Sequence, residues 1–305
     1  MVATFIIAIG VGATTTILTV ANGLLLRTPA GLRDPSELFT AHVVNRDGSS
    51  FHSFSYPLFR ELRESRWEGV DLAAIRGFAA STIIARGPRV LLGFGVTSGY
   101  FPILGTRAAL GRLLGPGDDQ GPDGPRVVVL SHSAWRSHFG ADSGIVGRAV
   151  TMNGQPYTVV GVAEPGFGGH VAAFDGAMWA PLEVTMAPSE RNRLTDPRSV
   201  WLELIGRASG TDLRVVEERL SAVSIRAGQT EGIGWDRRID VRAYTALPGA
   251  VLLPVMGFLG LLLLLGGTVM LISSSNIAGV MTARAMARAR ETAIRLTLGA
   301  PRRRL

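Results

Sequence analysis

Two long stretches of this chain carry no charged side chain, and they constrain its fold more than any other feature. No charged residue precedes Arg27, and none lies between Arg242 and Arg284. A helix rises about 1.5 Å per residue, so each stretch is long enough to cross the roughly 30 Å hydrocarbon core of a bilayer. We therefore expect one transmembrane helix over residues 1–26 and another over residues 248–276.

The formal net charge of +7 is concentrated at the C-terminal end. From Arg284 to Leu305 the sequence has seven arginines and one glutamate, so this segment alone contributes +6. A basic cluster directly after an apolar span is the positive-inside signature, which predicts a cytoplasmic C-terminus. Two spans then place residues 27–247 outside the cytoplasm, in a multi-pass protein of the cell (inner) membrane. We expect no nucleic-acid partner, because Arg302 to Arg304 follow a span and lack interleaved aromatic residues.

Between the two apolar stretches, the residue pattern predicts a mixed α/β domain. Asn153-Gly154 separates two apolar runs and predicts a two-residue hairpin turn with positive φ. Ser55 and Ser131 are each placed to cap a helix, and residues 99–115, rich in glycine, predict a long loop. Further elements are expected as strands over 90–96, 126–130, 201–206 and 239–244, and as a helix over 213–223.

No pattern in this domain predicts catalysis. The chain has no lysine, which excludes the usual phosphate-binding P-loop, and no cysteine, which excludes disulfides and thiolate metal sites. His42 falls in polar sequence that predicts a loop, and His132 and His138 are spaced six apart, so they do not share a helix face. Asp118-Asp119 reads as a solvated turn rather than an acid/base pair. We therefore expect no enzymatic activity, no cofactor and no metal site.

The C-terminal segment continues the second span as a cytoplasmic helix. Arg284, Arg288 and Arg295 recur on one side, and Glu291 can pair with Arg295 at i,i+4. Gly299 is well placed to end the helix. Such a helix could lie on the anionic inner leaflet, or it could dock in a groove of a soluble partner. The pattern is compatible with both arrangements.

Several segments resemble a known family. Glu291 to Ala300, followed by an arginine-rich turn, resembles the cytoplasmic signature of FtsX-like ABC transporter permeases. The middle of the chain is similar to the MacB-type periplasmic core, and the first span also fits with Gly10 to Thr15. The matching core segments are Ser55 to Pro57, Val96 to Phe101, Leu110 to Arg112, Val129 to Gly140 and Val146 to Val162. Together they cover nearly the whole chain in the family's order.

The resemblance implies a MacB-like periplasmic core domain over residues 27–247 and a coupling helix, the start of an FtsX-like domain, over residues 277–305. It implies a permease subunit whose separate ATPase binds beneath the membrane, while the outer domain acts on lipids, lipoproteins, peptides or an envelope partner. The implied partners are an ABC-type ATPase, membrane lipid, a second permease copy and a periplasmic partner. Carried over by position, the ATPase-contacting residues are Arg284, Arg288, Glu291, Arg295 and Gly299.

In one respect the sequence departs from this family. The family normally has two further spans after the coupling helix, whereas this sequence stops at Leu305. The expectation is then a truncated reading frame, one module of a split permease, or a remnant without transport activity. The competing functional class is a membrane-anchored envelope interaction domain that binds a partner without any ATPase.

Overall fold

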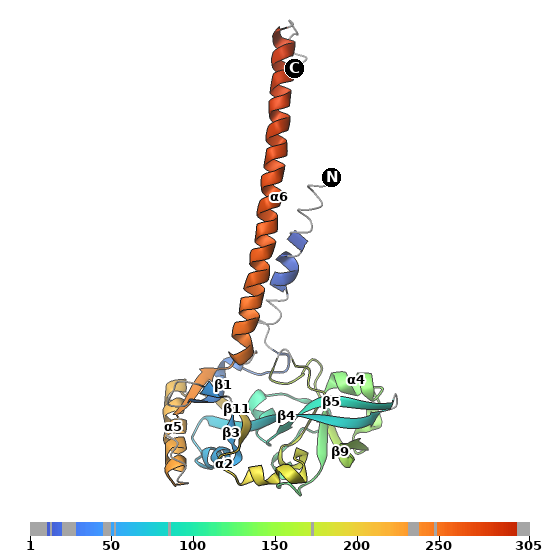
Figure 1. The fold of residues 1–305 in the computed structure, drawn as a ribbon. Helices are drawn as coiled ribbons and strands as arrows, with labels where there is room; N and C mark the ends of the chain where they lie inside the picture. Colours follow the sequence, from blue (N-terminus) through green and yellow to red (C-terminus); the bar gives the residue numbers. More distant parts are fainter. Residues whose placement is uncertain are drawn as a thin grey trace. The chain divides into compact units, whose positions relative to one another are not determined.

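The chain divides into two compact units. The computed structural model describes residues 11–12, 14–19, 29–44, 50–51, 53–84, 87–171, 174–230, 238–246 and 249–297. One unit, here called the helical unit, comprises Met1–Arg27 and Leu247–Leu305. The other unit, Thr28–Ala246, is the outer domain. Figure 1 shows the elements of both units along the chain.

The helical unit is dominated by α6, an unbroken helix of 49 residues (Gly249–Thr297). Its segment Leu253–Ile294 contains an 18-residue stretch with a mean hydropathy of 2.4, and of the described helices it is the one long and apolar enough to cross a membrane. Leu261, Leu264 and Leu271 are each more than half exposed. Exposed apolar side chains in such number are typical of a surface that faces lipid. This agrees with the predicted second span.

Most of the predicted first span, residues 1–26, lies outside the described residues. Residues 11–12 and 14–19 are helical. A Cβ atom added to Gly266 of α6 would lie 3.2 Å from the Thr14 hydroxyl oxygen, so these two helices approach closely at this point. Small and hydroxyl residues permit such close helix contacts in membranes.

The outer domain is built on one mixed sheet of 12 strands. The strands are β1 (Leu38–Val44), β2 (Ser50–Phe51), β3 (Phe54–Ser55), β4 (Val70–Ile84), β5 (Gly87–Val96), β6 (Ala108–Gly111), β7 (Val127–Leu130), β8 (Ala149–Met152), β9 (Gln155–Ala163), β10 (Met178–Pro181), β11 (Val200–Ala208) and β12 (Arg238–Ala243). Its main path runs β12-β1-β11-β4-β5-β10-β7-β9-β6, with β2, β3 and β8 paired off this path. The β5–β10 and β7–β9 pairs are parallel, and the other pairs are antiparallel.

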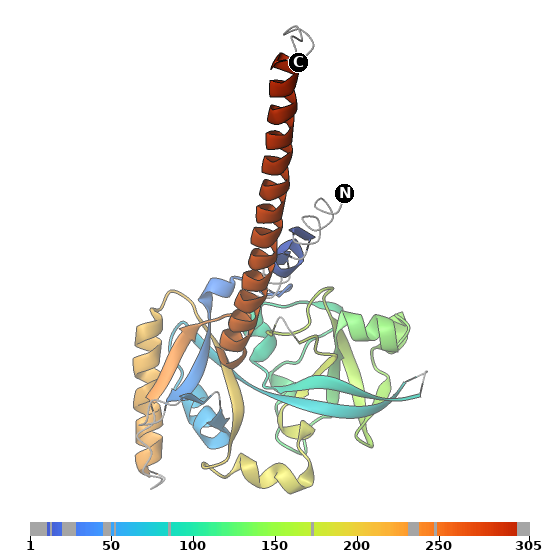
Figure 2. The same cartoon turned by 45° about the horizontal axis from the view of Figure 1, so that its top comes forward.

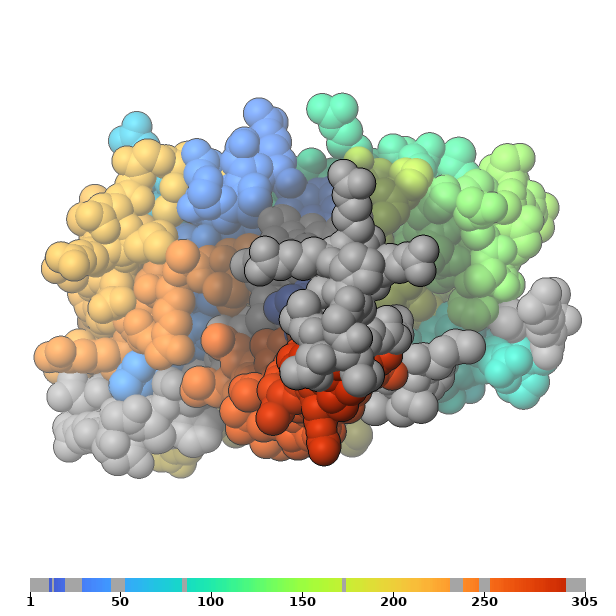
Figure 3. Space-filling model, turned by 90° about the horizontal axis from the view of Figure 1, so that it is seen from above, coloured from blue at the N-terminus to red at the C-terminus, as the bar shows by residue number. Residues whose placement is uncertain are grey.

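The helices divide the outer domain into two lobes. The α-helices are α2 (Tyr56–Glu64), α3 (Tyr100–Leu104), α4 (His132–His138) and α5 (Leu213–Thr230), and the 3-10 helices are η2 (Pro35–Glu37), η3 (Pro116–Asp118), η4 (Ser143–Ile145), η5 (Glu183–Thr185) and η6 (Pro188–Leu194). In the first lobe, α2 and α5 pack with β12, β1 and β11 around one apolar core. In the second lobe, α4 lies with β7, β8 and β9 around another. Figures 1 and 3 show α5 and α4 at opposite ends of the domain.

Strand β4 joins the two lobes. Its first part pairs with β11, from Val70↔Ala208 to Ile75↔Glu203, and it then pairs with β5 as far as Ile84. Figure 2 shows this long β4–β5 ribbon extending toward the end that holds α4. A third core, here called the shared core, draws residues from both lobes and includes the fully buried Tyr100 and Trp179. The outer domain is therefore one packed body.

Several predictions about local elements are confirmed. Asn153 and Gly154 have φ angles of 49° and 76°, as the hairpin turn requires. Ser55 accepts a hydrogen bond from the Leu58 amide at 3.4 Å, and Ser131 accepts one from the Ala134 amide at 3.1 Å, so both serines cap helices. The mixed α/β fold class is also confirmed.

Three expectations are wrong. Residues 99–115 are not one loop, because α3 and β6 form within them and the apolar side chains of α3 are buried. His42 lies inside β1 and is buried. Asp118 is only 5% exposed, and the Arg112 guanidinium donates to it at 2.6 and 2.8 Å. Burial alone raises the pKa of Asp118, but Arg112 and the Gly115 amide outweigh that effect and lower it.

Gly161 in β9 provides a test of this packing. A Cβ atom there would lie 2.1 Å from the Arg112 carbonyl oxygen and 2.8 Å from that of Leu110. Both neighbours are backbone atoms, so we expect Gly161→Ala to lower the free energy of unfolding by at least about 2 kcal/mol in urea titrations of the detergent-solubilised chain. The control is Gly115→Ala, because Gly115 is extended and has no atom within 4 Å of an added Cβ. Equal stability of the two variants would contradict the register of β6 on β9.

Candidate functional site

The two segments that connect the outer domain to the helical unit join paired strands. β1 and β12 are antiparallel neighbours, with Phe39 opposite Ala243, and the Tyr244 amide donates to the Leu38 carbonyl oxygen at 2.9 Å. The start of β1 and the end of β12 therefore lie next to each other at one edge of the sheet. We call residues 31–37 the N-terminal root and residues 244–246 the C-terminal root.

Arg207 of β11 holds the N-terminal root. Its guanidinium donates to the carbonyl oxygens of Ile103 at 2.8 Å and Asp34 at 3.3 Å, and also to that of Arg33. It also donates to the Glu37 carboxylate at 2.9 Å, and the Arg207 side chain is only 13% exposed. The hydrogen bond from Arg207, followed by one from Ser209, lowers the pKa of Glu37 below its ordinary value. One side chain thus ties the root to both β11 and α3.

The N-terminal root also contacts the shared core directly. The Arg33 amide donates to the Leu104 carbonyl oxygen at 2.8 Å, and the Thr106 hydroxyl donates to the Gly31 carbonyl oxygen at 3.0 Å. Gly31 has a φ of 81° and lies so close to Phe167 that an added Cβ would be 3.1 Å from its ring. Only glycine combines this backbone conformation with this approach.

The C-terminal root is held by Tyr244. Its hydroxyl donates to the His170 carbonyl oxygen, and burial raises the pKa of the Tyr244 phenol. His170 is itself buried, with its Nδ1 atom 3.1 Å from the Tyr100 hydroxyl and its ring edge-on to Phe94. The C-terminal root is therefore also fixed to residues of the shared core.

Both roots are thus attached to one rigid body by several hydrogen bonds each. A flexible linker would absorb a displacement of the membrane helices, whereas packed interiors transmit strain. The outer domain is therefore held by its own contacts at both ends where the chain continues toward the helical unit. Within the ranges that the structure describes, no group of three or more His, Asp or Glu side chains is placed to hold a metal ion.

The predicted ATPase-contacting residues lie near the end of α6. Arg284, Arg288 and Glu291 are exposed, and Arg295 belongs to the same helix by its backbone. Their spacing of four, three and four residues places all four within about 60° of arc on one helix face. Gly299 lies outside the described residues. Contact between this face and an ATPase stays a prediction.

The sequence did not predict the contacts that hold the N-terminal and C-terminal roots. Arg207 and Tyr244 bind backbone carbonyl groups of Ile103 and His170, which are far away in the sequence and could be supplied by any residue type. The one signal was an arginine inside the apolar strand β11, and that signal does not identify its partners.

Comparisons with known proteins agree with this architecture. The family model described as MacB-like periplasmic core domain matches residues 1–223. The periplasmic region of MacB from Actinobacillus actinomycetemcomitans aligns with 75% of this chain and 94% of its own length, at 17% identity and a TM-score of 0.50. A domain of a Porphyromonas gingivalis protein aligns with 71% of this chain and 94% of its own length, at 13% identity and a TM-score of 0.53. These structures share the fold. No curated protein matches the sequence of this chain.

The Glu37–Arg207 pair predicts a pH dependence. A carboxylate whose pKa is lowered by folding stabilises the protein above its ordinary pKa of 4.5, and this stabilisation is lost as the pH falls through the lower value. We expect wild type to melt a few degrees above Glu37→Gln at pH 7, and the difference to shrink below pH 4.5, in thermal unfolding followed by tryptophan fluorescence. Glu68→Gln, at an exposed position, is the control. A difference that does not change with pH would show that the carboxylate charge contributes nothing.

Proposed function

We propose, from the premise that the chain belongs to the family of MacB-like periplasmic core domain permeases of ABC transporters, that it transmits motion across the membrane. In this function a separate ATPase moves the helical unit from the cytoplasmic side, and the outer domain acts on its substrate or envelope partner. The chain does not enclose a path for the substrate. The function classes that fit are export, lipid or lipoprotein handling, and mechanical work in the envelope.

One observation carries the proposal. The two connections to the helical unit leave the outer domain from neighbouring paired strands, β1 and β12, and both are fixed to the shared core. A domain that only bound a partner could be tethered by loose linkers at any two surface points. Here the backbone on both sides is hydrogen-bonded to the body that would be moved, through Arg207 on one side and Tyr244 on the other.

The continuity of α6 favours a protein partner over the inner leaflet for the arginine face. If Val251 to Ile272 cross the hydrocarbon core, Arg284 lies about 18 Å further along the helix. The headgroup layer accounts for only about 7 Å of that distance, and screening by salt acts over about 8 Å. Because α6 does not break, its arginine face projects away from the lipid instead of lying on it.

In this proposal the partner ATPase, and not this chain, hydrolyses ATP. The chain has no lysine and hence no P-loop, so we propose that it is not an enzyme. A ligand shifts a two-state element only by binding its states differently, and ATP-driven closure of an ATPase dimer would supply that difference. Two ATPase subunits present two docking sites, which is the reason to propose a second permease copy in the assembly. The outer domain is then periplasmic, and the C-terminus cytoplasmic.

Charge reversal on the arginine face tests the coupling. We expect the double variant Arg288→Glu and Arg295→Glu to reduce the amount of ABC ATPase recovered with the affinity-purified chain by at least tenfold, because two attractive contacts become repulsive. The recovery is measured by quantitative mass spectrometry of proteins that carry a P-loop, after mild detergent extraction of native membranes.

Arg290 supplies the matched control. It lies on the same turn of α6 but faces about 200° away from Arg288. Arg290→Glu makes the same change of charge at the same depth and should leave recovery unchanged. Recovery that is unaffected in the double variant would instead favour an envelope interaction domain that works without an ATPase.

A further inference from the structure

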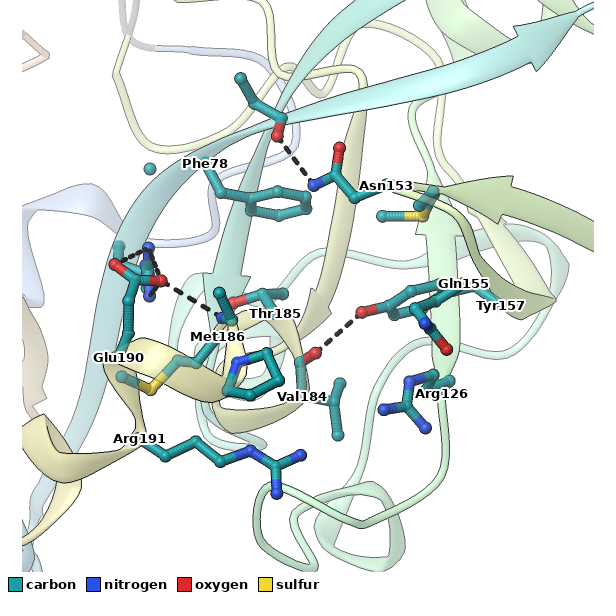
Figure 4. A pocket seen from close by; sticks show the side chains of 16 residues that line it. Phe78, Arg126, Asn153, Gln155, Tyr157, Val184, Thr185, Met186, Glu190 and Arg191 are labelled. Atoms are coloured by element: carbon teal, nitrogen blue, oxygen red, sulfur yellow. Dashed lines mark hydrogen bonds and ion pairs between the residues drawn. The ribbon is translucent and has the colours of Figure 1, made fainter.

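The second lobe contains a cavity that the proposed function does not use. Its volume is about 530 Å³, within the range typical of small-molecule sites. The walls come from four separate segments: β4, Arg126 just before β7, the β8–β9 hairpin, and the stretch from η5 to η6. Figure 4 shows this cavity with its lining side chains.

The lining of the cavity is cationic. Three arginines, Arg76, Arg126 and Arg191, face one acidic residue, Glu190, which gives a formal charge of +2. Glu190 already forms ion pairs with Arg76 at 3.4 Å and with Arg193 at 3.5 Å. It also accepts a hydrogen bond from the Ala187 amide at 3.3 Å. The carboxylate is therefore fully engaged, and it does not neutralise the other two arginines of the cavity.

Arg126 brings a buried guanidinium nitrogen without an acceptor to the cavity. Its Nε atom is buried and has no hydrogen-bond partner, and within the described part of the chain Arg126 forms no ion pair. The Arg126 guanidinium also interacts with the Tyr157 hydroxyl and opposes the burial that raises the pKa of this phenol, and the same hydroxyl donates to the Val184 carbonyl oxygen at 2.8 Å. A buried guanidinium nitrogen without an acceptor is costly, because desolvation of a charged group is not compensated. An anion in the cavity would remove that cost.

Arg191 approaches from the opposite wall. Its Nη2 atom is 3.0 Å from the carboxylate of Asp123, whose side chain is 82% exposed, and it donates to the Pro122 carbonyl oxygen at 3.2 Å. Its Nε atom is buried without a partner, as in Arg126. Figure 4 shows the guanidinium groups of Arg126 and Arg191 pointing toward one another. Two guanidinium groups so placed match the oxygens of a tetrahedral phosphate.

Beside the charged groups, the cavity has both polar and apolar lining side chains, the polar ones including Asn153, Gln155 and Thr185. Phe78, Val184 and Met186 line it beside the arginines. The Asn153 side chain fixes the hairpin wall to β4, accepting from the Ser81 amide at 2.8 Å and donating to the Ala79 carbonyl oxygen at 3.2 Å. The cavity is therefore preformed, which lowers the cost of binding.

We propose that this cavity binds a small amphiphilic phosphate. The phosphate lies between Arg126 and Arg191, and a short apolar portion packs against Phe78 and Met186. A phosphate monoester carries nearly two negative charges at pH 7, which matches the formal charge of the lining. The site lies wholly within the outer domain, so it does not depend on the coupling of α6 to an ATPase.

Hexyl phosphate is the probe. The full chain in dodecyl maltoside and phosphate-free buffer is heated with hexyl phosphate, inorganic phosphate, hexanoate or hexanol, and unfolding is followed by tryptophan fluorescence. We expect hexyl phosphate at a hundredfold excess over its Kd to raise the unfolding midpoint by about 5 °C. We expect smaller shifts from inorganic phosphate and hexanoate, and none from hexanol. Equal shifts from hexanol or inorganic phosphate would overturn the proposal, because one half of the ligand would then suffice.

Two variants separate a ligand site from a structural role. Arg126→Met should weaken hexyl phosphate binding at least tenfold, and without ligand it should melt at or above the wild-type temperature, because an uncompensated charge has been removed. Arg191→Met should also weaken binding, at little cost in stability, since its partner Asp123 is exposed. Arg136→Met, at an exposed position on α4, is the control and should bind as wild type does.

The outcomes are distinct. If Arg126→Met melts well below both wild type and Arg136→Met without ligand, Arg126 maintains the fold and the proposal is overturned. The same holds if hexyl phosphate stabilises Arg126→Met as much as wild type. The same thermal unfolding measurement with lysophosphatidate identifies the source of the ligand. If lysophosphatidate raises the unfolding midpoint more than hexyl phosphate does, the site binds a lipid headgroup. If it raises the midpoint less, the site binds a soluble organic phosphate. Either result supports the site.

Discussion

The antiparallel ladder between β1 and β12 is the interaction on which the rest of the architecture depends. Its six residue pairs run from Phe39↔Ala243 to Val44↔Arg238, and the two backbone connections leave from the same end, beside Phe39 and Ala243. In the proposed function, a force that moves both ends of the helical unit together carries the ladder with it. Forces that separate the helices would load its end pair first, and a ladder opened from one end breaks one pair at a time. In the proposed function, the end at Phe39 is therefore where a separating force would first reach the ladder.

Two side chains hold the backbone beside this end of the ladder. Arg207 holds the backbone just before β1, and Tyr244 holds the backbone just after β12, each through partners outside the ladder. A separating force must therefore break contacts with the shared core before it reaches the first ladder pair. The chemistry at position 207 requires arginine, because one planar fork donates to three carbonyl groups and a carboxylate. Lysine has three donors on one atom and could not reach this set.

Elements whose signal is local could be predicted from the sequence, and elements that depend on burial could not. The Asn153-Gly154 turn and the serine caps are each encoded within a few residues, and each uncharged stretch is one continuous run of sequence. Strand β4 was missed because its two Ala-Ala pairs, with Asp71 and Gly77, have low β-propensity, and it forms because β11 and β5 flank it. Strand β10 ends at Pro181 and is buried throughout, so it shows no alternation. The roots depend on carbonyl groups distant in sequence, which leave no trace in side-chain pattern.

The contrast between Arg207 and Arg126 shows what the sequence could not distinguish. Both arginines lie at strands in apolar surroundings, and both are largely withdrawn from solvent. Arg207 donates to four acceptors that the fold itself supplies, so its burial is explained by structure alone. Arg126 has a buried nitrogen without an acceptor, and the fold places Arg191 opposite it across a preformed cavity. Native proteins rarely leave such a donor unpaired, and the proposed phosphate supplies the acceptor that the described part of the chain does not.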